Sequence, residues 1–176
     1  MSVTPSQFPT INQSDLDGTE TLWAQKGGID YSLSLDNIKQ YGGCDVYCTS
    51  LVIPTASVLT LFATPIEIVA APGVGYAIDV ISATAKITYN SVAYATNTVL
   101  NLIYDGSTQA VLELAGASPF LAATSTLHGK FFGRNFSNAS NQIIENAAVK
   151  VSVQTGNPTA GDSGIKVYVQ YRIITI

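Results

Sequence analysis

Charge is scarce in this sequence. Only 11% of its 176 residues are Asp, Glu, Lys or Arg, whereas about 25% is typical of a soluble domain. The hydrophobic share is 47%, and a disordered chain would instead combine many charges with few apolar residues. We therefore expect a folded protein, long enough to bury a core without metal or disulfide support.

Long apolar runs are also missing. No uninterrupted stretch approaches the roughly 20 apolar residues that a membrane helix needs. The first 15 residues, MSVTPSQFPTINQSD, contain neither a basic segment nor an apolar one, so they do not form a secretory signal. The sequence therefore predicts no membrane partner and synthesis in a cytoplasm.

Cysteine and histidine are nearly absent. The chain has Cys44, Cys48 and one histidine, His128, which is too few side chains for a typical zinc site. Two strand positions four residues apart point along the same strand, so we expect ordinary semi-buried thiols, although spacing alone leaves a bridge open. No metal or other cofactor is expected.

Catalytic patterns are missing as well. His128 is the sole imidazole base, no nucleophile-elbow motif surrounds any serine, and the carboxylates of the C-terminal part are scattered singly. The loop Gly156–Gly164 lacks the lysine of a phosphate loop and the repeated Asp/Asn ligands of an EF-hand, so we expect a hairpin connection there. The sequence does not predict an enzyme.

The few charges are unevenly distributed. Residues 1–50 carry six acids and two bases, whereas residues 51–176 carry six of each. No basic footprint for nucleic acid is present. The neutral remainder is expected to self-associate, because little net charge weakens repulsion between copies.

The N-terminal part has its own organisation. Residues 1–16 predict an extended arm, and residues 17–43 predict a small module. In this module the runs 19–24 and 29–33 form a hairpin, and Ser34 caps a short helix over 34–41. Gly42 and Gly43 end this helix. Because an isolated hairpin is marginal, the module needs a partner surface.

Residues 44–176 predict a mainly β domain. Turn residues separate about eight strand-like runs, at 45–53, 56–62, 65–70, 76–89, 96–104, 109–115, 148–155 and 165–176. This pattern favours an antiparallel, jelly-roll-like β-sandwich. The run 76–89 is long enough to require a bend or bulge, and Asp105-Gly106 predicts a turn.

Two of these runs also predict a contact between copies. Runs 76–89 and 165–176 carry apolar or small neutral residues on both faces. One face can fill the core of the sandwich. The other then suits a second copy, because obligate interfaces are depleted of charge. We therefore expect a homo-oligomer.

Two segments resemble those of known proteins. Residues 16–41 resemble a short element near the N-termini of phage tail, neck and head fibre proteins, through Leu16, Gly18, Glu20, Leu22, Gly27, Gly28, Leu33 and Ile38. Residues 59–106 resemble the β-sandwich of small phage virion proteins, through Leu59–Pro65, Val69–Gly75 and Ala93–Asn97.

The resemblance implies a structural protein of a tailed-bacteriophage virion, either a head fibre or a capsid decoration protein, assembled as a homotrimer. It implies that the N-terminal part attaches to the major capsid protein or another virion protein, and that the sandwich projects. The attachment interface would then comprise Leu16, Glu20, Leu22, Trp23, Ile29, Leu33 and Ile38.

An alternative is a phage module that binds a receptor or a host surface glycan, as in a tail fibre or tip. Aromatic and basic side chains that can stack on sugars gather at Phe131, Phe132, Arg134 and Phe136. The same cluster also fits a place in the core or at a subunit interface, and the sequence alone does not separate these readings.

Overall fold

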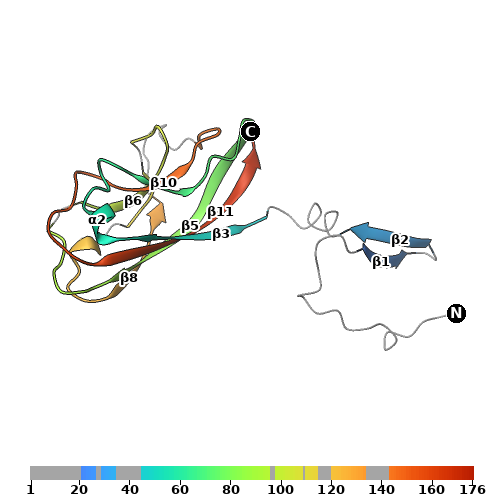
Figure 1. Ribbon diagram of the computed structural model, residues 1–176. Coiled ribbons are helices and arrows are strands. Elements are labelled where there is room, and N and C mark those ends of the chain that lie inside the picture. The colour runs from blue at the N-terminus through green and yellow to red at the C-terminus, as the bar shows by residue number, and fades with distance from the viewer. Residues whose placement is uncertain are drawn as a thin grey trace, which may run out of the picture. The chain divides into compact units, whose positions relative to one another are not determined.

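The computed structural model describes residues 21–26, 29–34, 45–95, 98–108, 110–114, 120–133 and 143–176. The chain divides into two compact units, Met1–Asp45 and Val46–Ile176 (Figure 1). Among the described residues, no helix has both the length and the apolarity needed to cross a membrane.

The first unit contains a β-hairpin. Strands β1 (Thr21–Lys26) and β2 (Ile29–Ser34) pair antiparallel, from Thr21 opposite Ser34 to Lys26 opposite Ile29. The predicted hairpin is therefore present, with its first strand shifted two residues toward the C-terminus. The predicted arm at 1–16, residues 35–41 of the predicted helix and the pair Gly42-Gly43 lie outside the described residues.

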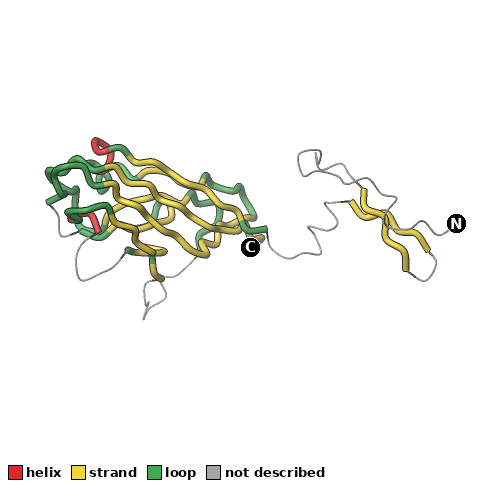
Figure 2. Tube along the Cα trace, turned by 90° about the horizontal axis from the view of Figure 1, so that it is seen from below, coloured by secondary structure: helices red, strands yellow, loops and turns green. Residues whose placement is uncertain are grey.

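The second unit is a sandwich of two antiparallel sheets, as predicted (Figure 2). The four-stranded sheet has the order β3 (Tyr47–Ile53), β11 (Gly164–Thr175), β5 (Tyr76–Thr88) and β8 (Leu127–Lys130). The five-stranded sheet has the order β4 (Ile66–Val69), β10 (Val149–Val153), β6 (Leu100–Tyr104), β7 (Ala110–Glu113) and β9 (Phe132–Gly133). The short helices α2 (Thr55–Val58) and η3 (Phe120–Ala122) lie in the connections.

The core lies between the two sheets. Alternate residues of each strand enter it, so Val149 and Val151 on β10 and Ile165 and Val167 on β11 are at most 1% exposed. Across the core, the Tyr104 hydroxyl of β6 donates a hydrogen bond to the Ile78 carbonyl of β5. Burial of this hydroxyl, followed by the nearby charge of Asp79, raises the pKa of Tyr104 to about 12.

Strand β5 contains the predicted bulge. Its pairing with β11 passes from Ser82 opposite Gln170 to Val80 opposite Tyr171, which leaves Ile81 without a register partner. Ile78 and Val80 face the core before the bulge, and Ala83, Ala85 and Ile87 face it afterwards. One extra residue therefore changes which set of alternating side chains is buried.

The run 56–62, counted above as a strand, forms α2 and a following turn, so that prediction is wrong. Pro54 precedes the helix, and its carbonyl accepts hydrogen bonds from the amides of Ser57 and Val58. Val58 and Leu61 are both fully buried. Their spacing of three places them on one side of a helical turn, and periodicity alone does not distinguish so short an apolar run from a strand.

Gly161 permits close packing against Tyr94. It has a φ of +84°, and a Cβ at this position would lie 2.3 Å from Cδ1 of the buried Tyr94 ring. We predict that Gly161→Ala lowers the free energy of unfolding by about 2–4 kcal/mol, through backbone strain and overpacking. Denaturant unfolding followed by circular dichroism measures this change.

Gly133→Ala is the matched control, because no atom lies within 4 Å of its added Cβ and its φ is not positive. Its effect should stay within about 0.5 kcal/mol. Equal destabilisation by the two substitutions would contradict the packing argument.

Candidate interaction surfaces

The side chains considered for catalysis do not form a cluster. His128 lies exposed on β8, and its register partner on β5 is Lys86. Within the described residues, no group of three or more His, Cys, Asp or Glu side chains could hold a metal ion. Cys48 is a free, exposed thiol on β3, so the expectation of a semi-buried thiol is wrong for this residue. Cys44 lies outside the described residues.

The loop Gly156–Gly164 is not a hairpin connection, since it joins β10 in one sheet to β11 in the other. Asp162 in this loop accepts hydrogen bonds from the Ser91 hydroxyl at 2.6 Å, the Ser91 and Val92 amides at 3.0 and 2.9 Å, and the Asn90 side-chain amide at 2.8 Å. These bonds, with the Ser91 hydroxyl contributing most, hold the pKa of Asp162 well below its usual range. Asp162 thus clamps two connecting loops together.

The clamp makes stability depend on pH. Because the folded-state pKa of Asp162 is depressed, its contribution is present above the unfolded-state pKa of about 3.9 and is lost as pH falls through the folded-state value. Asp162→Asn should therefore be less stable than the unmodified protein at pH 7, and the gap should shrink toward pH 2. Denaturant unfolding at pH 7, 4 and 2.5 tests this; a gap independent of pH would contradict it.

The predicted aromatic cluster is divided by the structure. Phe131 is 2% exposed and belongs to the core, whereas Phe132 on β9 is 58% exposed. Neighbouring residues of an extended chain point to opposite sides, which explains the contrast. Arg134 and Phe136 lie outside the described residues, so Phe132 is the described member of the cluster that a ligand can reach.

The predicted attachment residues are described only in part. In the β1–β2 hairpin, Leu22 pairs with Leu33, Trp23 with Ser32 and Ile29 with Lys26. Leu16, Glu20 and Ile38 lie outside the described residues. The attachment role of all seven residues stays a prediction.

The outer face of the four-stranded sheet is the first candidate surface. Residues directly opposite on neighbouring strands share a face, and the register defines three rows across the sheet. They are Cys48–Gln170–Ser82, Ser50–Tyr168–Thr84–Lys130 and Val52–Lys166–Lys86–His128. We call these three rows the outer face.

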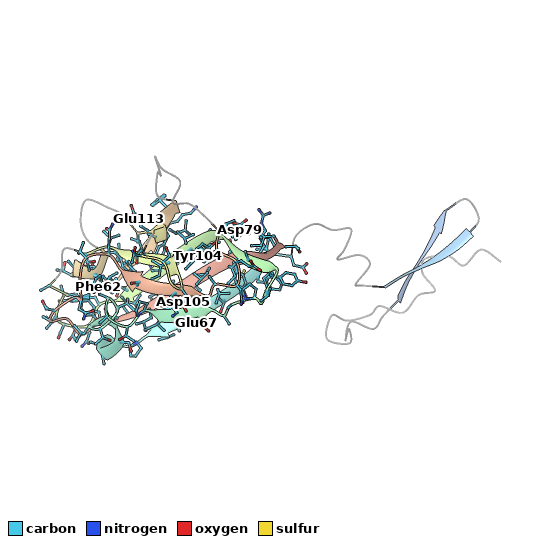
Figure 3. All side chains as sticks on the ribbon, turned by 90° about the horizontal axis from the view of Figure 1, so that it is seen from above. Phe62, Glu67, Asp79, Tyr104, Asp105 and Glu113 are labelled. Atoms are coloured by element: carbon cyan, nitrogen blue, oxygen red, sulfur yellow. The ribbon has the colours of Figure 1, made fainter. Side chains whose placement is uncertain are left out.

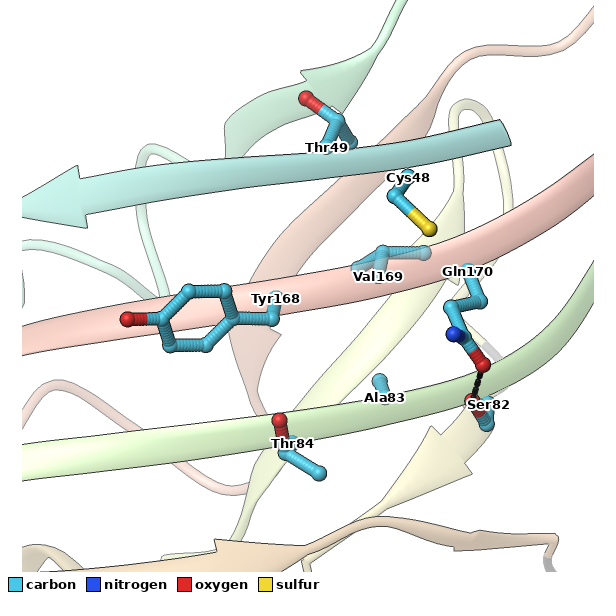
Figure 4. Close-up of a pocket in the computed structure, with 8 residues that line it drawn as sticks. All are labelled: Cys48, Thr49, Ser82, Ala83, Thr84, Tyr168, Val169 and Gln170. Carbon is cyan, nitrogen blue, oxygen red and sulfur yellow. Dashed lines mark hydrogen bonds between the residues drawn. The ribbon is translucent and has the colours of Figure 1, made fainter.

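Two hollows adjoin on the outer face. One of about 450 Å³ is lined by Cys48, Thr49, Ser82, Ala83, Thr84, Tyr168, Val169 and Gln170, which come from three neighbouring strands (Figure 4). The Ser82 hydroxyl donates to Oε1 of Gln170 at 2.8 Å (Figure 4). A second hollow of about 350 Å³ shares Thr84 and Tyr168 with the first and adds Lys86, His128 and Lys130.

The outer face is therefore neutral only in part. Its first row carries no charged side chain, but its third row contains Lys166 and Lys86 as direct register partners. Nζ of Lys166 lies 4.9 Å from the ring centroid of Tyr168, a cation–π contact. The expectation that this face lacks charge is wrong for its basic end, because cross-strand register brings lysines of distant segments together.

The second candidate surface is one end of the sandwich. The C-terminal part of β11 lies beside the start of β3, with Tyr171 opposite Tyr47, and the Ile176 amide bonds to the Gly75 carbonyl. The exposed apolar side chains at this end are Val46, Tyr47, Val74, Tyr76, Ile173 and Ile176, each between 43% and 80% exposed. We call this group the proximal end, since the chain joins the sandwich at Val46.

The outer side of the five-stranded sheet carries two acidic residues, Glu67 and Asp105, beside one base, Lys150. Nζ of Lys150 lies 2.7 Å from Oδ1 of Asp105, and Glu67 is the register partner of Lys150. Both carboxylate residues are labelled in Figure 3. Hydrogen bonding to Lys150 is the main cause that lowers the pKa of the Asp105 carboxyl.

Comparison with known proteins gives one structural likeness. No protein-family model and no curated protein matches the chain. A chain of the cyanophage Pam1 capsid asymmetric unit is similar in structure, with a TM-score of 0.45 and 17% sequence identity over 94% of this chain and 99% of that chain. Similarity at this level establishes neither a shared family nor a shared role.

Proposed function

We propose that the chain is a structural component of a bacteriophage virion, a head fibre or capsid decoration protein. It docks on the particle through its N-terminal region and projects the sandwich as a homotrimer. The resemblance of residues 16–41 and 59–106 to phage virion proteins, described above, motivates this proposal.

The observation that carries the proposal is the division of the chain at residues 45 and 46. The sandwich on the C-terminal side has its own continuous core, so it can fold without the first unit. The first 50 residues hold all the net charge, with six acids against two bases. This arrangement suits a protein in which one part binds a charged or polar surface and the other is displayed.

The proximal end supports the oligomer. Single exposed apolar residues are ordinary on a protein surface, but six of them here come from β3, β5, β11 and their flanking residues at one end. Contiguous apolar patches of this kind mark interaction sites. We propose that copies of the sandwich meet at this end, which leaves the outer face accessible.

Attachment can be tested on particles. Mass spectrometry of purified virions should detect the chain, and deletion of residues 17–43 should leave a folded sandwich that no longer sediments with them. Full-length chain carrying Phe132→Ala is the control and should remain bound. Virions that lack the chain, or retention of the deleted form, would contradict the proposal.

Assembly gives a second prediction. Light scattering at micromolar concentration should find a trimer for the unmodified chain and a monomer for the double variant Val74→Asp/Ile176→Asp, because each aspartate places a charge in the apolar contact. Phe62→Asp is the control, since Phe62 is 48% exposed but follows α2, away from the proximal end. A stable unmodified monomer, or equal dissociation of the control, would rule out this contact.

A further inference from the structure

We propose that the outer face of the four-stranded sheet binds an acidic glycan. Lys86, Lys130 and Lys166 contact its carboxylate groups, and Tyr168 packs against a sugar ring between the two hollows. This site differs from the aromatic cluster around Phe132, and it does not depend on whether the chain belongs to a virion.

The first argument is electrostatic. Lys86 and Lys166 are direct register partners on β5 and β11, a geometry that places their Cβ atoms about 5 Å apart. Like charges in this position destabilise a sheet. His128 is opposite Lys86, and Lys130 is opposite Thr84 in the next row. A bound anion would relieve the repulsion among the three lysines.

The sandwich supplies no such anion among its described residues. None of the carboxylates there forms an ion pair with Lys86, Lys130 or Lys166. Asp79 lies farther along β5 and is 2.7 Å from Nε of Arg172. Glu67 and Asp105 flank Lys150 on the other sheet. The equal numbers of acids and bases in residues 51–176 therefore conceal a basic face.

The second argument concerns the kind of anion. Lysine and serine are depleted in protein–protein interfaces, whereas this face carries three lysines together with Ser50, Ser82 and Thr84. The hollows of about 450 and 350 Å³ lie within the range of about 300–1,000 Å³ that is usual for small-ligand sites. The composition and the hollows favour a polar ligand over a protein surface.

Tyr168 favours a sugar as the ligand. Its side chain lines both hollows and is 43% exposed. One face of the ring holds Nζ of Lys166, so the opposite face offers an apolar surface for the C–H groups of a sugar. Hydroxyl and amide groups of Ser82, Thr84 and Gln170 can exchange hydrogen bonds with sugar hydroxyls. The neutral hollow then holds an uncharged part of the glycan, and the basic hollow holds its acid groups.

The test is calorimetric titration of the full chain with three probes of equal length: a hexasaccharide of galacturonate, maltohexaose and a hexa-aspartate peptide. We expect the galacturonate hexamer to bind most tightly, with affinity that falls as salt rises. The double variant Lys86→Gln/Lys166→Gln should bind it at least about tenfold more weakly. The free double variant should be at least as stable as the unmodified chain at low salt, because a like-charge pair is removed.

Two control variants sharpen the result. Lys150→Gln removes a lysine from the opposite sheet and should leave galacturonate binding unchanged. Tyr168→Ser should weaken galacturonate binding but not the weaker binding of hexa-aspartate. Equal affinity for maltohexaose would show that charge is not recognised, and equal or tighter binding of hexa-aspartate would indicate an acidic protein partner. Each of these two results would overturn the proposal. So would binding of none of the three probes, or a loss of galacturonate affinity in Lys150→Gln as large as in the Lys86→Gln/Lys166→Gln variant.

Discussion

The bulge at Ile81 determines which side chains the sandwich buries and which it displays. Without it, the alternation of β5 would place Ile78, Val80, Ser82 and Thr84 on one face, and no single orientation could bury the apolar residues of both halves. One extra residue removes this conflict. It allows Ala83, Ala85 and Ile87 to join the core and turns Ser82, Thr84 and Lys86 outward, where β11 supplies their register partners.

Strand β11 extends the same inward and outward alternation of side chains from β5 to β3. It lies between β3 and β5 over most of its length, so its inward residues complete the core and its outward residues complete each row of the outer face. The same strand ends at the proximal end, where Ile173 and, just after the strand, Ile176 remain exposed. Neutral, basic and apolar regions therefore occupy different parts of one continuous sheet, which allows separate contacts with copies of the chain and with a ligand.

Much of this fold is predictable from local sequence patterns, whereas the composition of its surfaces is harder to predict. Alternation in β10 and β11 and the Asp105-Gly106 turn identify strands, and the length of the run 76–89 implies the bulge. The strand predicted over 56–62 is wrong because a short apolar run does not distinguish a strand from a helical turn. The hairpin predicted at Gly156–Gly164 is wrong because turn composition does not say which sheet the next strand joins. The basic end of the outer face was missed, since Lys86, Lys130 and Lys166 are distant in sequence and meet only through register.

The two-unit organisation and the exposed proximal end support the proposed role, in which the N-terminal region attaches to the particle and the sandwich is displayed. An electron cryo-microscopy map of the purified particle tests this role most directly. The account predicts density for the sandwich projecting from the particle surface, with the proximal end toward the particle and residues before Val46 in contact with another virion protein. A map without this density, or with the sandwich anchored by its outer face, would contradict it.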